Sequence, residues 1–279
     1  MSTVTKVKPF LKWAGGKYRL FAEIQNHFIP AKRLVEPFFG AGSIALNSDF
    51  PSVLANDLQT DLLTLWYVVK NHPKPLVRLA KEFFEGGNDV DVFYARRQEF
   101  NDTKDPMRRS ALFVYLNRHC FNGLCRFNSQ GNFNVPFGRY KTVYFPEKEI
   151  LSCSEKAKNF DFTNQDFREV FKQVTPDDLV YCDPPYIPLS ATASFSDYTG
   201  DGFEERDHYD LASCAYSAAK KGATVIISNQ NNSSLVGLYK AFGAVIHEIN
   251  VKRFISGKAQ ERNSVTEILA VFSSQKENI

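Results

Sequence analysis

The sequence predicts an α/β fold built on a doubly wound sheet, and three observations favour that class. Short apolar runs of strand length recur along the 279 residues, with helical patterns between them. A turn with two glycines follows the first run, and a carboxylate ends the second. The composition, 43% hydrophobic and 23% charged, is that of a globular chain large enough for one core with an insertion.

A first strand–helix–strand unit is expected near the N-terminus. Residues 34–36 predict a short buried strand that runs into the glycine turn at residues 37–43. A helix is expected to open at residues 44–46. Residues 53–57 predict a second strand, and the apolar-rich residues 62–69 predict the helix after it.

The second half of the chain continues the same alternation. Residues 179–182 and 224–228 predict two more strands, with a helix over residues 205–221 between them. Residues 244–251 and 265–272 are rich in β-forming residues and flank a polar loop. We therefore expect an antiparallel hairpin at the edge of the sheet.

A long segment separates the second strand from the strand at residues 179–182. It carries a helical pattern over residues 96–116 and is too long for a crossover connection. Residues 106–145 hold six basic side chains and no acidic one, so this stretch is +6 and the rest of the chain is −3. Basic residues among aromatics and asparagines favour a nucleic-acid surface, although a solvated basic face is the ordinary alternative. We predict an inserted, mainly helical recognition domain at 59–145 and a discontinuous sheet domain at 1–58 and 146–279.

The glycine turn and the second strand predict a cofactor site. Gly40 and Gly42 allow a ligand to approach the backbone, and Asp57 is placed to accept hydrogen bonds from two ribose hydroxyls. This pattern indicates a cofactor that contains a nucleoside. Ala45 stands where the dinucleotide fingerprint needs a third glycine, which disfavours a pyrophosphate. A purely structural turn is the alternative.

The strongest signal is Asp183-Pro184-Pro185-Tyr186, directly after an apolar strand. The lone pair of an exocyclic amino group on a base is delocalised into the ring, and acceptors on its two hydrogens free it for attack on a methyl sulfonium. The Asp183 carboxylate supplies one acceptor and the Pro184 carbonyl another, in a loop that the prolines stiffen. Tyr186 stacks on the base, which contributes about 1–3 kcal/mol. We therefore predict these four residues to be catalytic; a Pro-Pro pair that simply ends the strand is the alternative.

The sequence gives no sign of a metal site or a disulfide framework. The five cysteines form no CxxC pair, and His119 with Cys120 and Cys125 lacks a second pair at ligand spacing. No apolar run approaches the roughly 20 residues that span a bilayer, and the N-terminus has no apolar signal region. We expect a cytoplasmic monomer with no metal and no membrane partner.

The motifs as a whole resemble the Dam-type DNA adenine-N6 methyltransferases, which use S-adenosylmethionine and recognise GATC. Residues 10–17 are similar to the family's N-terminal motif, 36–43 to its cofactor loop and 183–186 to its catalytic motif, in the order of the alpha arrangement. The resemblance covers nearly the whole chain and implies a Rossmann-like methyltransferase sheet and a double-stranded DNA substrate with a flipped-out adenine. The implied cofactor-site residues are Trp13, Lys17, Glu36, Pro37, Phe38, Gly40, Gly42, Ser43, Asp57, Asp166, Phe167 and Asp183.

Residues 117–126 and 134–141 are similar to the family's DNA-reading hairpin and its flank. In this likeness Arg126 grips a guanine, Phe121 fills the space left by the flipped base, and Leu124 touches a thymine methyl. The other implied DNA contacts are Lys12, Arg97, Arg118, Asn122, Pro136, Arg139, Tyr140 and Lys141. The family's Tyr-Gly-Tyr is His119-Cys120-Phe121 here, which keeps the aromatic wedge without its hydroxyl.

Three other functions stay open on the residues alone. Methylation of cytosine N4 or of RNA adenine is disfavoured by Asp183, because cytosine-N4 enzymes often carry Ser there, and by the resemblance over the whole chain. A DNA-binding regulator without catalysis is disfavoured by the intact Asp183 and Tyr186. A nicotinamide-dependent oxidoreductase is disfavoured by the missing third glycine.

Overall fold

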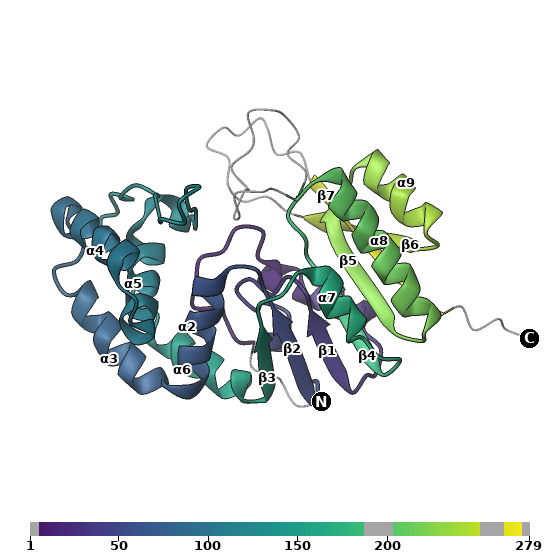
Figure 1. The fold of residues 1–279 in the computed structure, drawn as a ribbon, viewed down its shortest axis with the longest axis horizontal. Coiled ribbons are helices and arrows are strands. Elements are labelled where there is room, and N and C mark those ends of the chain that lie inside the picture. Colours follow the sequence, from purple (N-terminus) through teal and green to yellow (C-terminus); the bar gives the residue numbers. More distant parts are fainter. Residues whose placement is uncertain (1–5, 187–202, 252–264, 275–279) are drawn as a thin grey trace, which may run out of the picture.

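The structure is a computed structural model that describes residues 6–186, 203–251 and 265–274. Among these residues the centre is a seven-stranded sheet in the order β3-β2-β1-β4-β5-β7-β6 (Figure 1). The strands are β1 (Arg33–Glu36), β2 (Ser52–Asn56), β3 (Phe160–Thr163), β4 (Asp178–Cys182), β5 (Thr224–Gln230), β6 (Val245–Val251) and β7 (Val265–Phe272). β1 to β5 are parallel, and β7 runs antiparallel to both β5 and β6. The predicted doubly wound sheet with an antiparallel edge hairpin is confirmed.

The strand order reverses between β1 and β4. Val35 of β1 lies opposite Leu54 of β2 on one side and Val180 of β4 on the other. The carboxyl ends of these three strands therefore meet at one edge of the sheet. In open α/β sheets this is where ligands bind.

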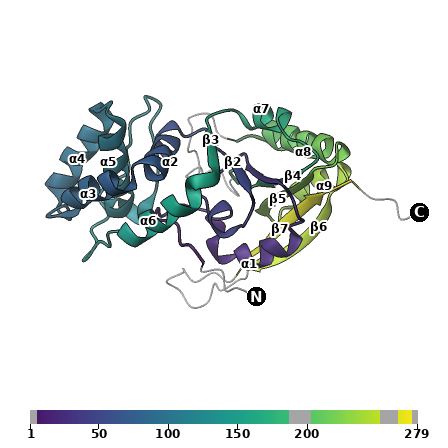
Figure 2. The ribbon, with the colours of Figure 1, turned by 90° about the horizontal axis from the view of Figure 1, so that it is seen from below.

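Both faces of the sheet are covered, as a parallel sheet requires. On β1, Leu34 packs into one hydrophobic cluster and Val35 into the other. The Val35 face carries α7 (Phe167–Lys172), α8 (Glu205–Lys220) and α9 (Ser233–Ala241), and α1 (Phe21–Ile24) lies on the opposite face (Figure 2). None of the helices in the described part of the chain is long and apolar enough to cross a membrane.

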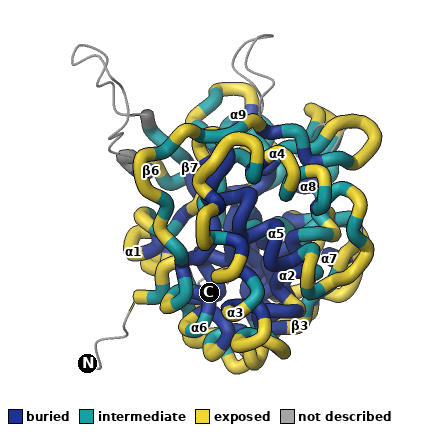
Figure 3. The backbone as a smooth tube through the Cα atoms, turned by 90° about the vertical axis from the view of Figure 1, so that its left-hand side faces the viewer, coloured by how far each residue is buried: buried dark blue, intermediate teal, exposed yellow. Residues whose placement is uncertain are grey.

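The helices between β2 and β3 form a separate lobe beside the sheet (Figure 1). They are α2 (Thr60–Asn71), α3 (Pro73–Phe84), α4 (Val90–Asp102), α5 (Pro106–His119) and α6 (Glu147–Lys156). α5 is the centre of this lobe, because every residue from 110 to 119 is buried (Figure 3). Asp105 caps α5 by accepting a hydrogen bond from the Arg108 amide, and Pro106 fits its first turn. Single 3₁₀ turns occur at Lys17–Arg19, Gln25–His27, Ala45–Asn47, Phe121–Gly123 and Ala157–Asn159.

Three features differ from the sequence-based expectation. The predicted helix at residues 44–46 is only the 3₁₀ turn Ala45–Asn47, because the Asn47 side chain donates to the carbonyls of Val7 and Ser43 and the chain extends at Ser48 toward β2. The strand β3 is not predicted, because four residues at the sheet edge that include two polar ones give a weak apolar signal. The lobe also continues beyond residue 145, since α6 packs on α2 and α3.

Candidate active site and nucleic-acid interface

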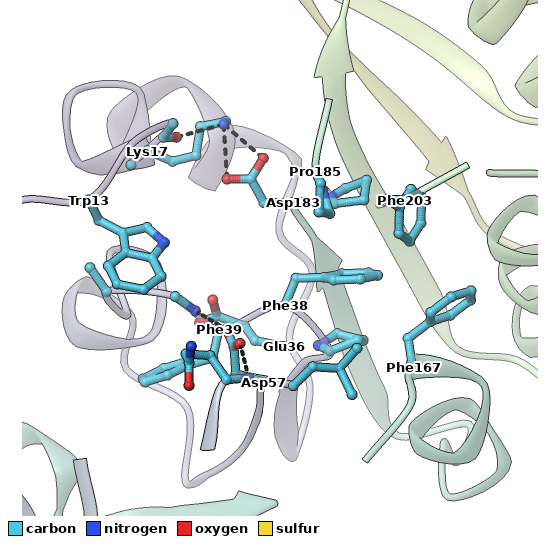
Figure 4. A pocket seen from close by; sticks show the side chains of 18 of the residues that line it. Trp13, Lys17, Glu36, Phe38, Phe39, Asp57, Phe167, Asp183, Pro185 and Phe203 are labelled. Carbon is cyan, nitrogen blue, oxygen red and sulfur yellow. Dashed lines mark hydrogen bonds and ion pairs between the residues drawn. The ribbon is translucent and has the colours of Figure 1, made fainter. Parts of the chain in front are cut away.

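A cavity of about 690 Å³ lies at the carboxyl ends of β1, β2 and β4 (Figure 4). Its walls come from parts of the chain that are far apart in sequence, since Trp13 faces across it toward Pro185 and Phe203. The predicted cofactor residues on its walls are Trp13, Lys17, Glu36, Pro37, Phe38, Gly40, Ser43, Asp57, Asp166, Phe167 and Asp183, and the predicted catalytic residues Pro184, Pro185 and Tyr186 join them. Gly42 does not line the cavity: its φ is +69°, and an added Cβ would lie 2.7 Å from the Phe39 ring.

The glycine turn and Asp57 hold each other in place. The Gly40 amide donates to Asp57 Oδ2 at 2.8 Å, and the Gln59 amide donates to Oδ1 at 2.9 Å. Burial raises the pKa of Asp57, and the backbone donors oppose that shift. A carboxylate has about four lone-pair sites, so Asp57 keeps acceptor capacity for hydroxyl groups. It stands across the cavity from Asp183 (Figure 4).

Gly40 has no room for a side chain. Its φ is +53°, and an added Cβ would lie 2.8 Å from Trp13 Nε1. We expect Gly40→Ala to weaken cofactor binding about tenfold, because Trp13 must move and the left-handed backbone is strained. Calorimetric titration with S-adenosylhomocysteine measures this affinity. Gly86→Ala is the matched control, because Gly86 has a φ of +66° with open space around it; equal losses in both variants would contradict the Trp13 contact.

Asp183 follows β4 and is held by two elements far away in sequence. Lys17 Nζ lies 2.7 Å from Asp183 Oδ1 and 2.9 Å from Oδ2 (Figure 4). Ser228, in the carboxyl-terminal half of β5, donates to Oδ1 at 3.0 Å. Lys17 is 3% exposed, and its Nζ also lies 3.9 Å from Glu267 and 5.0 Å from the centre of the Tyr186 ring. The carboxylate therefore has a fixed orientation at the wall of the cavity.

Glu36 is a buried acid on the same wall. Its Oε1 accepts a hydrogen bond from the Ala45 amide at 2.7 Å. Burial raises the pKa of Glu36 well above its ordinary value; the Ala45 bond opposes this, and the nearby Asp183 charge adds to it. The cavity therefore holds a carboxyl group that favours the neutral form.

The raised pKa of Glu36 predicts a pH-dependent gain in stability on its replacement. As the pH rises, Glu36 loses its carboxyl proton in the unfolded protein before it does so in the folded protein. The folded state is therefore fully stable below the pKa of Glu36 in the unfolded protein. It loses stability as the pH rises from there through the higher pKa in the folded protein. Gln keeps the oxygen that faces Ala45 but carries no charge. We expect Glu36→Gln to raise Tm at about pH 8 and to leave it near wild type at about pH 4. Thermal melts at both pH values test this; the exposed Glu23→Gln is the control, and an equal shift at both values would contradict it.

Three phenylalanines close the end of the cavity near α7. The ring centre of Phe38 lies 5.5 Å from that of Phe167 and 5.6 Å from that of Phe203. Arg168 pairs with Asp166 at 3.1 Å and also with Asp207 and Asp210 on α8. The aromatic rings suit a flat heterocycle. The ion pair with Arg168 fixes the carboxylate of Asp166 beside these rings.

Several residues of this site are not predicted from the sequence. They are Phe39, Arg168, Phe203, Ser228 and Glu267. Leu124 is predicted as a DNA contact but not as part of the cavity. Ser228 alone has a local signal, because it is the polar residue that ends an apolar strand. The others enter through tertiary packing.

The predicted DNA-reading hairpin lies beyond α5. Phe121 is 49% exposed, and Asn122 has a φ of +54°, which turns the chain at the base of the hairpin, next to the Cys120–Phe137 bridge. Arg126 Nε donates to Asn134 Oδ1 at 2.8 Å, and this bond orients the guanidinium group. Leu124 lines the cavity itself. The remaining predicted contacts Pro136, Arg139 and Lys141 are exposed.

The basic patch is smaller than the sequence suggests. Arg118 is buried and donates to the Phe10 carbonyl, which argues against the expected DNA contact. Arg109 pairs with Asp61, and Arg108 with Glu99, two acids that lie outside the +6 segment. Two further residues that are expected to contact DNA also have partners within the protein. Arg97 donates to the Val135 carbonyl at 3.2 Å, and Lys12 Nζ lies 4.3 Å over the ring of Tyr140.

Comparison with known proteins gives a consistent result. The family model for the D12 class N6 adenine-specific DNA methyltransferases matches residues 13–255. The chain is 44% identical over 270 residues to a DNA adenine methylase of Vibrio cholerae serotype O1, covering 96% of this chain and 97% of that one. It is 42% identical over 268 residues to the DNA adenine methylase of Escherichia coli strain K12, covering 96% of each. Among solved structures, a precorrin-6y C5,15-methyltransferase of Geobacter metallireducens has a TM-score of 0.40 at 8% identity, over 92% of this chain and 86% of that one.

Proposed function

Because the chain belongs to the D12 class of N6 adenine-specific DNA methyltransferases, we propose that it methylates N6 of the adenine in double-stranded GATC with S-adenosylmethionine as the methyl donor. The observation that supports this most is the Asp183 carboxylate, fixed by Lys17 and Ser228 on the wall of a cavity large enough for a nucleoside cofactor. The division into a sheet domain and a recognition domain at 59–145 belongs to the same proposal.

The residues of the cavity fit the proposed cofactor. Asp57 offers acceptor sites for ribose hydroxyls, and the cluster of Phe38, Phe167 and Phe203 offers an aromatic surface on which an adenine ring can pack. The carboxyl of Glu36 suits the amino group of the methionine part. S-adenosylmethionine, when bound, supplies an electrophilic methyl group on a sulfonium.

The chain's own residues prepare the target amino group. Lys17 and Ser228 occupy about three of the four lone-pair sites of Asp183, so one remains for an amino hydrogen of adenine. The Pro184 carbonyl accepts the second hydrogen, so the N6 lone pair is free to attack the methyl group. The N–C bond forms as the S–C bond of the donor breaks, and the extra N6 proton then leaves to the Asp183 carboxylate or to water. The Tyr186 ring, beside Lys17, stacks on the flipped base.

Radiolabelled methyl transfer tests the proposal. The substrate is a duplex with one GATC site, and the control is the same duplex with that adenine replaced. Transfer to the first duplex only is the expected result. Transfer to both would overturn the recognition of GATC but keep the chemistry, and transfer to neither would overturn the proposed substrate.

Arg126 is the residue on which the sequence preference depends in this proposal. We expect Arg126→Ala to cost about 1–3 kcal/mol at one base pair and to relax the choice there, because a bidentate contact to guanine is lost. Transfer rates on a set of singly substituted duplexes measure this. Lys141→Ala, at an exposed and proposed phosphate contact, is the control and should weaken all duplexes alike. An unchanged preference in the Arg126 variant would refute the guanine assignment.

A further inference from the structure

Asn117 is a fully buried amide at the junction of the helical lobe and the N-terminal segment. It lies in the last turn of α5 and is 1% exposed. Its Oδ1 accepts a hydrogen bond from the Lys12 amide at 2.8 Å, and its Nδ2 donates to the Lys12 carbonyl at 2.8 Å and to the Gly123 carbonyl at 3.1 Å. One side chain therefore holds both backbone groups of Lys12 and the last residue of the 3₁₀ turn Phe121–Gly123 at the base of the hairpin.

The N-terminal segment that Asn117 holds at Lys12 leads directly into the cavity. Lys12 lies in no helix or strand, so its backbone groups take their partners from Asn117. The next residue, Trp13, lies against Gly40 on the cavity wall. Five residues after Lys12, Lys17 pairs with Asp183. A shift of the Lys12 peptide is thus passed to both the cofactor wall and the catalytic carboxylate.

The 3₁₀ turn Phe121–Gly123 at the base of the hairpin, held on the other side, carries Phe121, one of the proposed base contacts. Gly123 ends the turn that presents Phe121, and its φ is +67°. An added Cβ on Gly123 would lie 2.5 Å from Lys12 Cβ, so the two segments are in direct contact. The hairpin and the N-terminal segment therefore cannot move independently without breaking buried hydrogen bonds.

We propose that Asn117 is a positioning residue that couples recognition of the DNA to the cofactor cavity. The proposal rests on the proposed function, since it takes the cavity as the cofactor site and the hairpin as the DNA-reading element. When the hairpin engages its duplex, Asn117 carries the Lys12 peptide with it and sets the positions of Trp13 and Lys17. Such coupling is reciprocal, so each ligand strengthens the binding of the other.

The experiment measures the coupling factor. The dissociation constant of S-adenosylhomocysteine, which cannot react, is determined by calorimetry with the full chain alone and with the chain saturated by a GATC duplex. The ratio of the two constants is the coupling factor. We expect it to be at least about fivefold in the wild type and close to one in Asn117→Ala.

Asn101→Ala is the matched control. Asn101 also accepts from and donates to one backbone unit of the recognition lobe, that of Phe133, at 2.8 and 3.3 Å. Neither bond reaches the N-terminal segment. The control should therefore keep the wild-type coupling factor, whereas a general loosening of the lobe would lower it in both variants and overturn the proposal.

The remaining outcomes are distinct from failure of the proposed function. A wild type that binds both ligands without coupling, or an Asn117→Ala variant with the wild-type coupling factor, overturns the role of Asn117 alone. A wild type that binds neither ligand overturns the proposed function instead. Where Asn117→Ala fails to fold in a thermal melt, Asn117→Ser keeps a hydroxyl for one of the three bonds, and wild-type coupling in that variant overturns the proposal.

Discussion

Asp183→Ala is expected to slow methyl transfer by roughly 10³-fold and to leave duplex binding intact. The carboxylate is the side-chain acceptor next to the Pro184 carbonyl, and it lies on the cavity wall rather than on the hairpin. Loss of one preorganised hydrogen-bond partner of a reacting group costs roughly 10²–10³-fold in rate, and we expect a loss at the upper end of this range. Single-turnover transfer on a GATC duplex measures the rate, and fluorescence anisotropy measures duplex binding.

Ser228→Ala provides a graded control for this variant. It removes one of the bonds that orient Asp183 but keeps the carboxylate and the Lys17 ion pair. The loss should be about tenfold, the scale of one hydrogen bond of about 1.4 kcal/mol. If Asp183→Ala weakens duplex binding as strongly as it slows transfer, the carboxylate does not act on the target amino group.

Lys17→Met has the second large expected effect. Lys17 is 3% exposed and lies near two carboxylates, those of Asp183 and Glu267. Without the Lys17 ammonium group, the carboxylates of Asp183 and Glu267 lie near each other at the cavity wall with no positive charge between them. Loss of one partner of a buried ion pair destabilises a protein by about 3–5 kcal/mol, and the 22% exposure of Asp183 favours the lower end. We expect a lower Tm together with a loss of transfer, because the catalytic carboxylate is no longer oriented.

A double variant separates the two effects of Lys17. Lys17→Met with Asp183→Asn removes the uncompensated charge, so Tm should recover while transfer stays lost. Lys70→Met is the control for loss of a partly buried lysine, since Lys70 donates to the Phe160 carbonyl away from the cavity. Full transfer activity in the single Lys17 variant would show that the ion pair does not position Asp183.

The sequence alone determines the two loops that carry the chemistry. The glycine turn at residues 37–43 and the Asp183 loop are local, because positive φ values at Gly40 and Gly42 and the two prolines fix the backbone wherever it is placed. An apolar strand precedes each loop, and this correctly predicts that both loops lie at the carboxyl-end edge of the sheet. For this reason the succession of the main strands along the chain agrees with the structure, and nearly all residues predicted for the cofactor site line one cavity.

Only the tertiary structure decides which charges are available and what holds the catalytic group. The sequence predicts a basic surface that includes Arg108, Arg109 and Arg118. In the structure, packing buries Arg118, and ion pairs form between Arg108 and Glu99 and between Arg109 and Asp61. The Lys17–Asp183 pair joins residues 166 positions apart. Local backbone preferences carry no information about such distances, because the free energy of a buried polar contact depends on the partner that folding places beside it.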